Sequence, residues 1–156
     1  MRAEEAGALE RLWHERGAKM WRSLLEFTGE PDLASDALAE AFAQALARGD
    51  AIRDAERWIW RASFKIAAGE LQRRRATVAA DPRAGPAELP EPVADIVAAL
   101  RRLSPNQRAA AVLHDYADLP TRDVARIVGC SQATVRVHLA QARRRLRELL
   151  KDDDDA

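Results

Sequence analysis

Residues 119–150, with the sequence LPTRDVARIVGCSQATVRVHLAQARRRLRELL, constrain the fold more than any other stretch of the chain. A first short helix is predicted by apolar residues at helical spacing, namely Val124, Ile127 and Val128, with Thr121 suited to cap it. Gly129 suits a left-handed helix end, and the Ser131 hydroxyl suits the start of a second helix. Two helices joined by a short glycine-containing turn form a helix-turn-helix, which presents its second helix to the major groove of DNA.

The second predicted helix has a buried and an exposed side. Winding it at about 100° per residue gives an apolar face of Val135, Leu139, Ala142, Leu146, Leu149 and Leu150. The opposite strip carries Val137, Ala140, Gln141 and Arg144. Between Ser131 and Arg147 there are five arginines and no acidic residue, which favours DNA phosphate as the partner. Val137 and Ala140 suit thymine methyl groups and Gln141 suits a base edge; a basic helix that does not bind DNA is the alternative.

The composition favours an all-α chain that stays in the cytosol. Ala, Leu, Arg and Glu are abundant among the 156 residues, and 47% of residues are hydrophobic, enough for packed helical cores. No run of about 18 apolar residues and no apolar signal-peptide core is present, so we expect no membrane insertion and a cytoplasmic location. The net charge of zero conceals a basic segment, because residues 93–150 carry ten basic and five acidic side chains.

The pattern predicts two small helical domains and a connecting segment. The first domain spans 1–75, with helices over residues 4–28, from Pro31 to about residue 46, and from Asp54 to about Arg75. Residues 76–92 contain four prolines and no periodicity, which is typical of an extended, flexible linker. The second domain spans 93–150 and includes a predicted capping box at residues 104–107. The acidic tail, residues 151–156, is expected to be disordered.

The helix expected over residues 54–75 is a candidate surface for single-stranded nucleic acid. Cations at Arg57, Arg61 and Lys65 lie beside the aromatic residues Trp60 and Phe64, a combination that suits base stacking and phosphate pairing. Trp58, Ile59, Ala62 and Ile66 are expected on another side of the helix. A second packing face with incidental arginines explains the aromatic residues equally well. The run of arginines at 73–75 is a candidate grip on duplex phosphates.

The sequence contains no sign of catalysis. His14, His114 and His138 are scattered without metal-ligand spacing, and no nucleophile elbow or glycine-rich phosphate loop is present. Cys130 is the only cysteine, so an intrachain disulfide is excluded. We interpret it as a small residue packed in the turn, with a redox-sensing thiol as the alternative. We therefore expect a binding protein without cofactor or metal, and not an enzyme.

Motifs in both halves resemble one family. L-S-P-N-Q-R at 103–108 and D-V-A-R-I-V-G-C-S-Q-A-T-V-R at 123–136 are similar to motifs of bacterial sigma factors of the extracytoplasmic-function (ECF) group, with Ala133 where glycine is usual. L-A-S-D-A-L-A-E-A-F at 33–42, W-I-W-R at 58–61 and R-R-R at 73–75 match the front half of that family. Ser35 and Ala39 replace a glutamate and a glutamine, while Lys65 and Gly69 replace an asparagine and an aspartate. The resemblance covers about residues 8–150.

The resemblance implies a sigma region 2-like domain and a sigma region 4-like helix-turn-helix domain, which together direct promoter-specific transcription initiation. Binding to core RNA polymerase would involve Asp36, Glu40 and Phe42. The −10 element would be bound by Arg57, Trp60, Arg61, Phe64, Lys65, Arg73 and Arg74. The −35 element would be bound by Ser131, Gln132, Thr134, Arg136, Val137, His138, Gln141, Arg143 and Arg144.

The resemblance also implies partners: core polymerase, promoter DNA and an anti-sigma factor, with the linker passing through the polymerase cleft. A stand-alone helix-turn-helix regulator is the alternative function. A third reading is a sigma-like protein that has lost promoter activity and serves only as an interaction partner.

Overall fold

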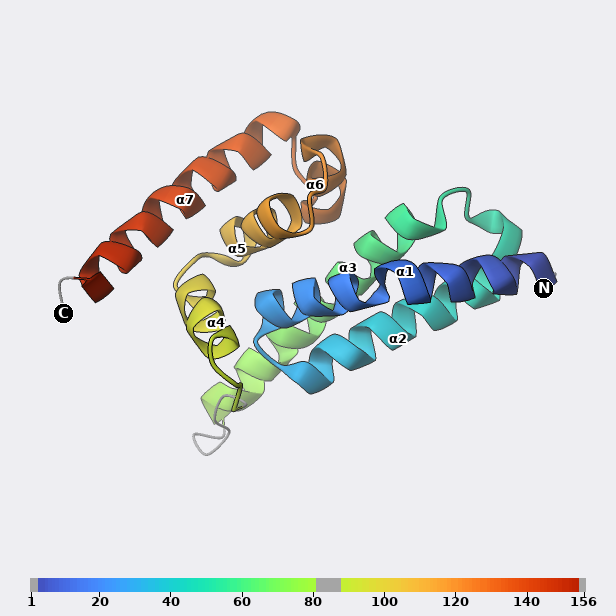
Figure 1. The fold of residues 1–156 in the computed structure, drawn as a ribbon, viewed down its shortest axis with the longest axis horizontal. Helices are drawn as coiled ribbons and strands as arrows, with labels where there is room; N and C mark the ends of the chain where they lie inside the picture. Colours follow the sequence, from blue (N-terminus) through green and yellow to red (C-terminus); the bar gives the residue numbers. More distant parts are fainter. Residues whose placement is uncertain (1–2, 81–87, 155–156) are drawn as a thin grey trace. The chain divides into compact units, whose positions relative to one another are not determined.

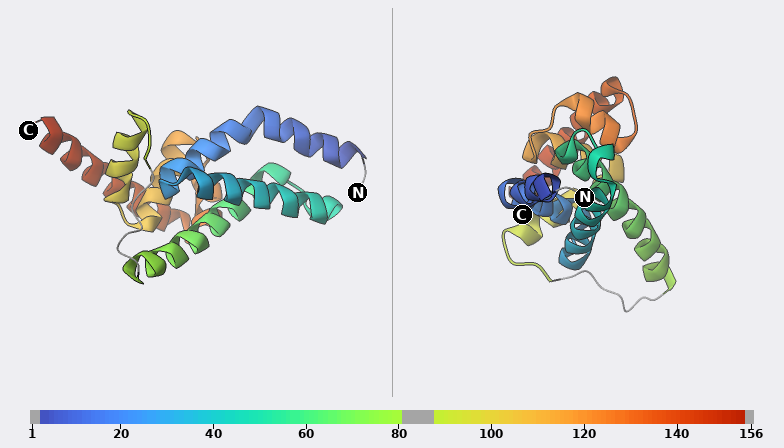
Figure 2. Two further views of the ribbon diagram at one scale, coloured as in Figure 1. Left: turned by 90° about the horizontal axis from the view of Figure 1, so that it is seen from below. Right: turned by 90° about the vertical axis from the view of Figure 1, so that its right-hand side faces the viewer.

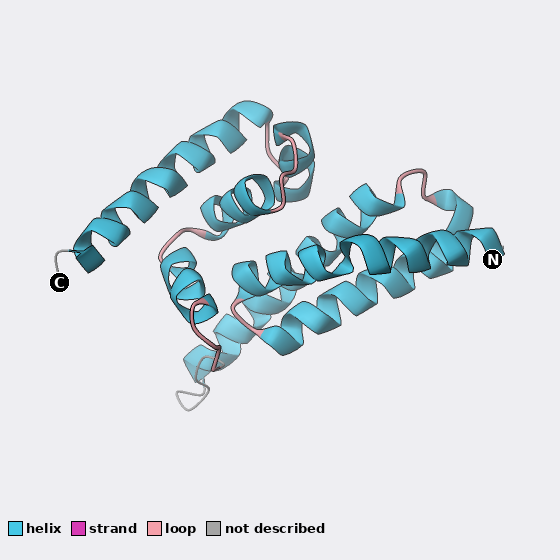
Figure 3. Ribbon diagram, viewed as in Figure 1, coloured by secondary structure: helices cyan, strands magenta, loops and turns pink. Residues whose placement is uncertain are grey.

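The computed structural model describes residues 3–80 and 88–154, which fold into two compact units that divide between Ala87 and Glu88. Within those ranges every regular element is helical and no strand is present (Figures 1 and 3). The prediction of an all-α chain is therefore confirmed. No helix in the described ranges combines the length and apolar character needed to cross a membrane.

The first unit consists of three long helices, α1 (Ala3–Thr28), α2 (Pro31–Arg48) and α3 (Ala55–Ala80), with a short 3₁₀ turn, η1 (Gly49–Ala51), before α3. Each of these helices packs against the other two (Figures 1 and 2). The reversal between α1 and α2 depends on Gly29, which has a φ of 72° and donates its N–H to the Leu25 carbonyl at 2.6 Å. Pro31 then begins α2, as expected for a residue that lacks a donor at the first helical position.

The core of the first unit combines large apolar side chains from all three helices with alanines, most of them on α2. Its fully or almost fully buried members are Met20, Leu24, Phe27, Leu33, Ala34, Ala37, Leu38, Ala41, Ile59, Trp60, Phe64 and Ala67. The alanines on α2 let its backbone approach the neighbouring helices closely. Each large apolar side chain buried in this way contributes roughly 1.5–3 kcal/mol of transfer free energy, so this core sets the position of all three helices.

Helix α3 ends at Ala80 and not near Arg75, so the first residues of the predicted linker are helical. Residues 76–80 read A-T-V-A-A and contain neither glycine nor proline, so nothing interrupts the helix before Pro82. Adding a turn to an existing helix requires no new nucleation, which favours this extension. Residues 81–87 of the predicted linker lie outside the described residues.

The second unit contains α4 (Val93–Arg101), α5 (Pro105–Ala111), the π-helical turn η2 (Val112–Tyr116), α6 (Thr121–Val128) and α7 (Gln132–Asp154). The predicted capping box at the start of α5 is confirmed: the Ser104 Oγ accepts from the Gln107 N–H, and the Gln107 Oε1 accepts from the Ser104 N–H, both at 3.2 Å. Its core comprises Val97, Leu100, Leu103, Leu113, Val124, Val135, Leu139 and Ala142.

Helix α7 is longer than the sequence predicted. Residues 151–154 were expected to be disordered, but they continue α7 to Asp154. The segment has no glycine or proline, and extension of a helix already packed on its unit adds one hydrogen bond for each residue that it orders.

Candidate nucleic-acid interface

The turn of the helix-turn-helix has the predicted local chemistry. Gly129 adopts a left-handed conformation, with φ 82° and ψ 39°, and its N–H and that of Cys130 both donate to the Ala125 carbonyl, at 2.8 and 3.0 Å. The Ser131 Oγ accepts from the Thr134 N–H at 3.1 Å and so caps α7. Thr121, in contrast, is the first residue of α6 and not its cap, because Pro120 occupies that position. Its hydroxyl donates instead to the Gln132 Oε1 at 3.2 Å, which links the two helices.

Over the first half of α7, the buried and exposed faces match those predicted from helical periodicity. Val135 and Ala142 are fully buried and Leu139 nearly so, whereas Val137 on the opposite side is 53% exposed. Over the last turns the prediction of a buried face is wrong. Leu146 and Leu149 are only half-buried and Leu150 is 61% exposed, so the fully buried face of α7 ends at Ala142.

The residues proposed to contact duplex DNA differ in how freely their side chains can reach it. Arg136, Val137 and Arg144 are exposed and make no polar contact with other described residues. Several others have intramolecular partners: Gln132 with Thr121, Gln141 with Gln107, Ser131 with Thr134, and Arg143 with Asp115. His138 is half-buried, and its Nδ1 has no hydrogen-bond partner among the described residues.

Arg143 is held by the turn that precedes α6. Its Nη2 donates to the Asp115 Oδ1 at 2.7 Å and its Nε to Oδ2 at 3.3 Å, a two-pronged contact that joins α7 to η2. The hydrogen bond and charge of Asp115 raise the pKa of Arg143 above its ordinary value. This arginine therefore helps to position α7 and is less available to an external phosphate than Arg136 or Arg144.

Helix α6 contributes cations that the sequence analysis did not include. Arg122 and Arg126 are exposed on α6 and make no polar contact with other described residues. The first helix of a helix-turn-helix crosses the DNA backbone, so cations there are suited to phosphate. The sequence could have predicted their exposure, since both arginines alternate with the apolar residues that define α6.

On α3, the predicted aromatic surface is wrong. Trp60 is 1% exposed and Phe64 3% exposed, so neither can stack on a base. Their rings belong to the core, with centroid distances of 6.1 Å between Trp60 and Phe64 and 5.3 Å between Phe64 and Phe27. The accessible aromatic residue is Trp58, which is half-buried and lies 5.2 Å from the Arg48 guanidinium. Arg57, Arg61 and Lys65 are exposed, as expected.

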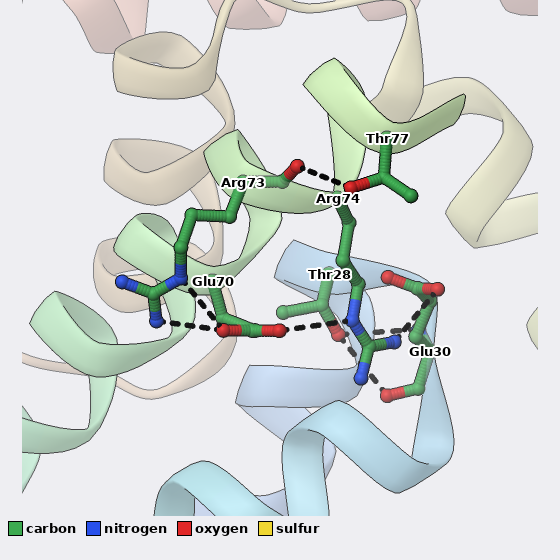
Figure 4. Close-up of polar contacts among 6 residues, drawn as sticks. All are labelled: Thr28, Glu30, Glu70, Arg73, Arg74 and Thr77. Carbon is green, nitrogen blue, oxygen red and sulfur yellow. Dashed lines mark hydrogen bonds and ion pairs between the residues drawn. The ribbon is translucent and has the colours of Figure 1, made fainter. Parts of the chain in front are cut away.

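The arginine run near the end of α3 is largely occupied by glutamates (Figure 4). The Arg73 Nη2 and Nε donate to the Glu70 Oε2 at 2.6 and 3.0 Å. Arg74 donates from Nη1 to the Glu30 Oε1 at 3.0 Å and from Nε to the Glu70 Oε1 at 3.4 Å. The hydrogen bond from Arg73 is the main cause of the lowered pKa of Glu70. Arg75 is exposed and makes no polar contact with other described residues.

The candidate polymerase-binding residues divide between two sides of α2. Asp36 and Glu40 are exposed and line a groove of about 350 Å³ together with Leu33, Ala37, Ile66, Glu70 and Arg74. Phe42 lies about 200° around the helix from Glu40. It is half-buried and packs edge-to-face on Trp13, with ring centroids 5.0 Å apart and an interplanar angle of 82°. The structure therefore groups Asp36 with Glu40 but places Phe42 elsewhere.

The described residues contain no group of three or more His, Cys, Asp or Glu side chains positioned to hold a metal ion. Exposed cations lie on α3, α6 and α7, and a mostly acidic groove lies between α2 and α3.

Comparison with known proteins relates both halves of the chain to one family. Residues 94–146 match the family described as "Sigma-70, region 4". The chain is 28% identical over 167 residues to "ECF RNA polymerase sigma factor SigL" of Mycobacterium tuberculosis, a match that covers 96% of this chain and 93% of that protein. The chain covers more than nine-tenths of this relative, so the similarity is not limited to the helix-turn-helix.

Two solved structures share the fold. The sigma factor RpoE of Bartonella quintana, solved with the anti-sigma factor NepR, gives a TM-score of 0.73 at 23% identity over 91% of this chain and 98% of that one. CnrH, solved with the cytosolic domain of CnrY, gives a TM-score of 0.76 at 20% identity over 95% of this chain and 90% of that one. Residues 94–146 thus match sigma-70 region 4, the chain as a whole is similar to an ECF RNA polymerase sigma factor at 28% identity, and its fold is shared with the two solved structures.

Proposed function

We propose that this chain binds core RNA polymerase through its first unit and directs transcription initiation by binding the −10 and −35 elements of a promoter. One observation carries the assignment: a cationic, exposed face of α7 and an acidic groove beside α2 occur in the same chain, on two separate helical units. A protein that only binds duplex DNA has no use for the second surface. We propose a binding function and no catalysis.

The −35 duplex is assigned to the first half of α7. Arg136 and Val137 are exposed near the N-terminal end of the helix, where a helix-turn-helix contacts base edges, and Arg144 lies farther along the exposed strip. Gln132 and Gln141 reach DNA by exchanging their contacts with Thr121 and Gln107. Arg122 and Arg126 on α6 bind the flanking phosphates.

The −10 element is assigned to the exposed row of cations on α3, Arg57, Arg61 and Lys65, with Trp58 as the aromatic residue closest to solvent. Holding an unpaired base outside the stack costs a few kcal/mol of free energy. Cationic contacts to the strand on either side of that base, together with the accessible edge of Trp58, are suited to offset this free energy.

Core polymerase is assigned to the groove wall formed by Asp36 and Glu40. Both carboxylates are exposed one helical turn apart, next to the apolar side chains of Leu33 and Ala37. We further propose that the protein acts in the cytoplasm, where the polymerase is, and that an anti-sigma protein regulates it. One of the two solved structures with this fold is a complex with an anti-sigma factor, and the other is a complex with the cytosolic domain of CnrY.

The deciding experiment is reconstituted transcription. Core polymerase that lacks any sigma factor is mixed with the purified chain and a library of promoter fragments, and run-off products are sequenced to identify start sites. We expect products only when the chain is present, and Asp36→Asn with Glu40→Gln should reduce both polymerase association and product.

The alternative, a stand-alone helix-turn-helix regulator, predicts sequence-specific DNA binding by the free chain without association with core polymerase. Association without any run-off product from the whole library would instead indicate a sigma-like interaction partner. Either result would replace the proposed function.

A further inference from the structure

The groove beside Asp36 and Glu40 is built by two helices and not by α2 alone. Leu33 and Ala37 of α2 and Ile66 of α3 supply apolar side chains, while Glu70 and Arg74 of α3 complete the lining. Three carboxylates therefore face this groove against one guanidinium group. Such a surface fits an amphipathic helix that carries basic side chains beside apolar ones.

Glu70 connects this groove to the arginine run of α3 (Figure 4). Its Oε2 accepts two hydrogen bonds from Arg73, and its Oε1 accepts a longer one from Arg74. Arg74 has a second partner, because its Nη1 also donates to Glu30 at 3.0 Å, in the turn between α1 and α2. Withdrawal of Glu70 would therefore leave Arg74 anchored but remove both hydrogen bonds that the Arg73 side chain makes within the described residues.

The contact between Glu70 and Arg73 is readily exchanged. The Arg73 side chain is 73% exposed and that of Glu70 is 36% exposed. Ion pairs at such accessible positions are weak, because water and salt screen them and both side chains lose conformational freedom. A cation presented by a partner in the groove can thus compete with Arg73 for the same carboxylate.

We propose that Glu70 extends the polymerase-binding surface from α2 onto α3. A basic amphipathic helix of core polymerase binds in the groove and draws Glu70 away from Arg73. Arg73 is then released to bind DNA phosphate. This inference rests on the proposed function, since it takes core polymerase as the occupant. The exchange couples polymerase binding to DNA-backbone binding through the Glu70 side chain. The contact between Arg74 and Glu30 keeps the end of α3 in place meanwhile.

The first test uses the free full-length chain and a duplex of mixed sequence, with affinity measured over a series of salt concentrations. Glu70→Gln should tighten binding and steepen the dependence of log affinity on log salt by up to about 0.9, the value for one additional phosphate contact. Glu15→Gln removes the same charge from an exposed position on α1 that makes no ion pair with an arginine among the described residues, so it controls for the change in net charge. The double variant Glu70→Gln with Arg73→Gln should have the slope of Arg73→Gln alone.

The second test measures the affinity for core polymerase. Glu70→Gln should weaken it by about 2- to 5-fold, the factor expected for one exposed ion pair, whereas Arg73→Gln should not weaken it. In the assembled holoenzyme, Arg73→Gln should lower the salt slope of promoter binding by about 0.9, and Glu70→Gln should leave that slope unchanged.

The coupling is refuted if Glu70→Gln does not steepen the slope of the free chain beyond the Glu15→Gln control, or if the steeper slope persists in the double variant. It is also refuted if Glu70→Gln leaves polymerase affinity unchanged. Failure of the wild-type chain to bind core polymerase would refute the proposed function itself. That measurement does not involve the variants, so the two kinds of failure can be distinguished. Circular dichroism of each variant verifies that the helices are retained.

Discussion

Arginines on α7 differ in role although they share one helix. Arg136 and Arg144 are exposed without polar contacts to other described residues, whereas Arg143 is bound by Asp115 and Arg145 lies 3.4 Å from Glu148. At the scale of single residues, the number of arginines in a basic helix therefore overstates the number that can bind DNA at once. The neighbouring acidic residues decide which guanidinium groups are available.

Arg136→Ala should weaken binding of the reconstituted holoenzyme to its −35 duplex by about 1–3 kcal/mol, because a good bidentate contact to a base edge has that value. The measurement is an equilibrium titration on the selected promoter and on a scrambled duplex of equal length. Arg145→Ala, which removes a partly engaged arginine of the same helix, is the matched control and should have a smaller effect. Equal losses on both duplexes would assign Arg136 to phosphate and not to a base.

Gly69→Ala should stabilise the first unit by roughly 0.5–1 kcal/mol, because glycine in a helix interior is less favourable than alanine by about that amount. A Cβ atom added at Gly69 meets no atom within 4 Å, so no steric penalty opposes the gain. The measurement is urea unfolding followed by tryptophan fluorescence.

Gly49→Ala is the control for that prediction. Gly49 has a φ of 51°, and an added Cβ would lie 3.1 Å from the Glu5 Oε2. This substitution should lower the unfolding midpoint. If Gly69→Ala also lowered the unfolding midpoint, helix propensity would not be what determines the effect of this substitution on stability.

At the scale of elements, the helix-turn-helix is determined by local signals. Gly129 and Ser131 specify the turn within a few residues, and the capping box at Ser104 does the same for α5. Such features depend on backbone conformation and short side chains, so the sequence predicts them well. The pairing of Arg73 with Glu70, three residues apart on one helix, was likewise readable from spacing.

Other features depend on contacts that sequence spacing does not contain. Helix α3 has aromatic residues on two sides, and only its packing against Phe27 of α1 decides that Trp60 and Phe64 are buried while Trp58 stays accessible. The contact between Glu30 and Arg74 joins residues 44 positions apart and has no periodic signature.

Ser131 gives a prediction for α7 as a whole. Ser131→Ala should destabilise the second unit by about 0.5–2 kcal/mol, because the first turn of α7 loses its side-chain cap. Ser131→Asp retains a capping oxygen and should preserve stability, yet it places a negative charge beside DNA phosphate and should weaken promoter binding. Thermal unfolding by circular dichroism and DNA titration separate the two effects. If Ser131→Asp bound DNA as well as the wild type, the start of α7 would lie away from the backbone.

At the scale of the whole molecule, the two units should unfold as separate cooperative transitions. All four tryptophans, at positions 13, 21, 58 and 60, lie in the first unit, whereas both units contribute helical circular dichroism. Urea unfolding followed by fluorescence should therefore report the first unit alone, and the two probes should give curves that do not coincide.

Leu113→Ala tests that independence. Leu113 is fully buried in the second unit, so its truncation should destabilise that unit by about 2–5 kcal/mol. We expect a shift in the circular dichroism curve and none in the fluorescence curve. Leu24→Ala, which truncates a fully buried residue of the first unit, should shift the fluorescence midpoint. A fluorescence shift in Leu113→Ala would mean that the units unfold as one.

The separation of buried and accessible positions along α3 has a consequence for promoter engineering. Ile59, Trp60, Phe64 and Ala67 are confined to the interior, while positions 57, 61, 65 and 68 are accessible at intervals of about one turn. Randomising those four positions leaves the interior untouched. Under the proposed function, a combinatorial library at these positions should alter −10 preference while the scaffold is retained.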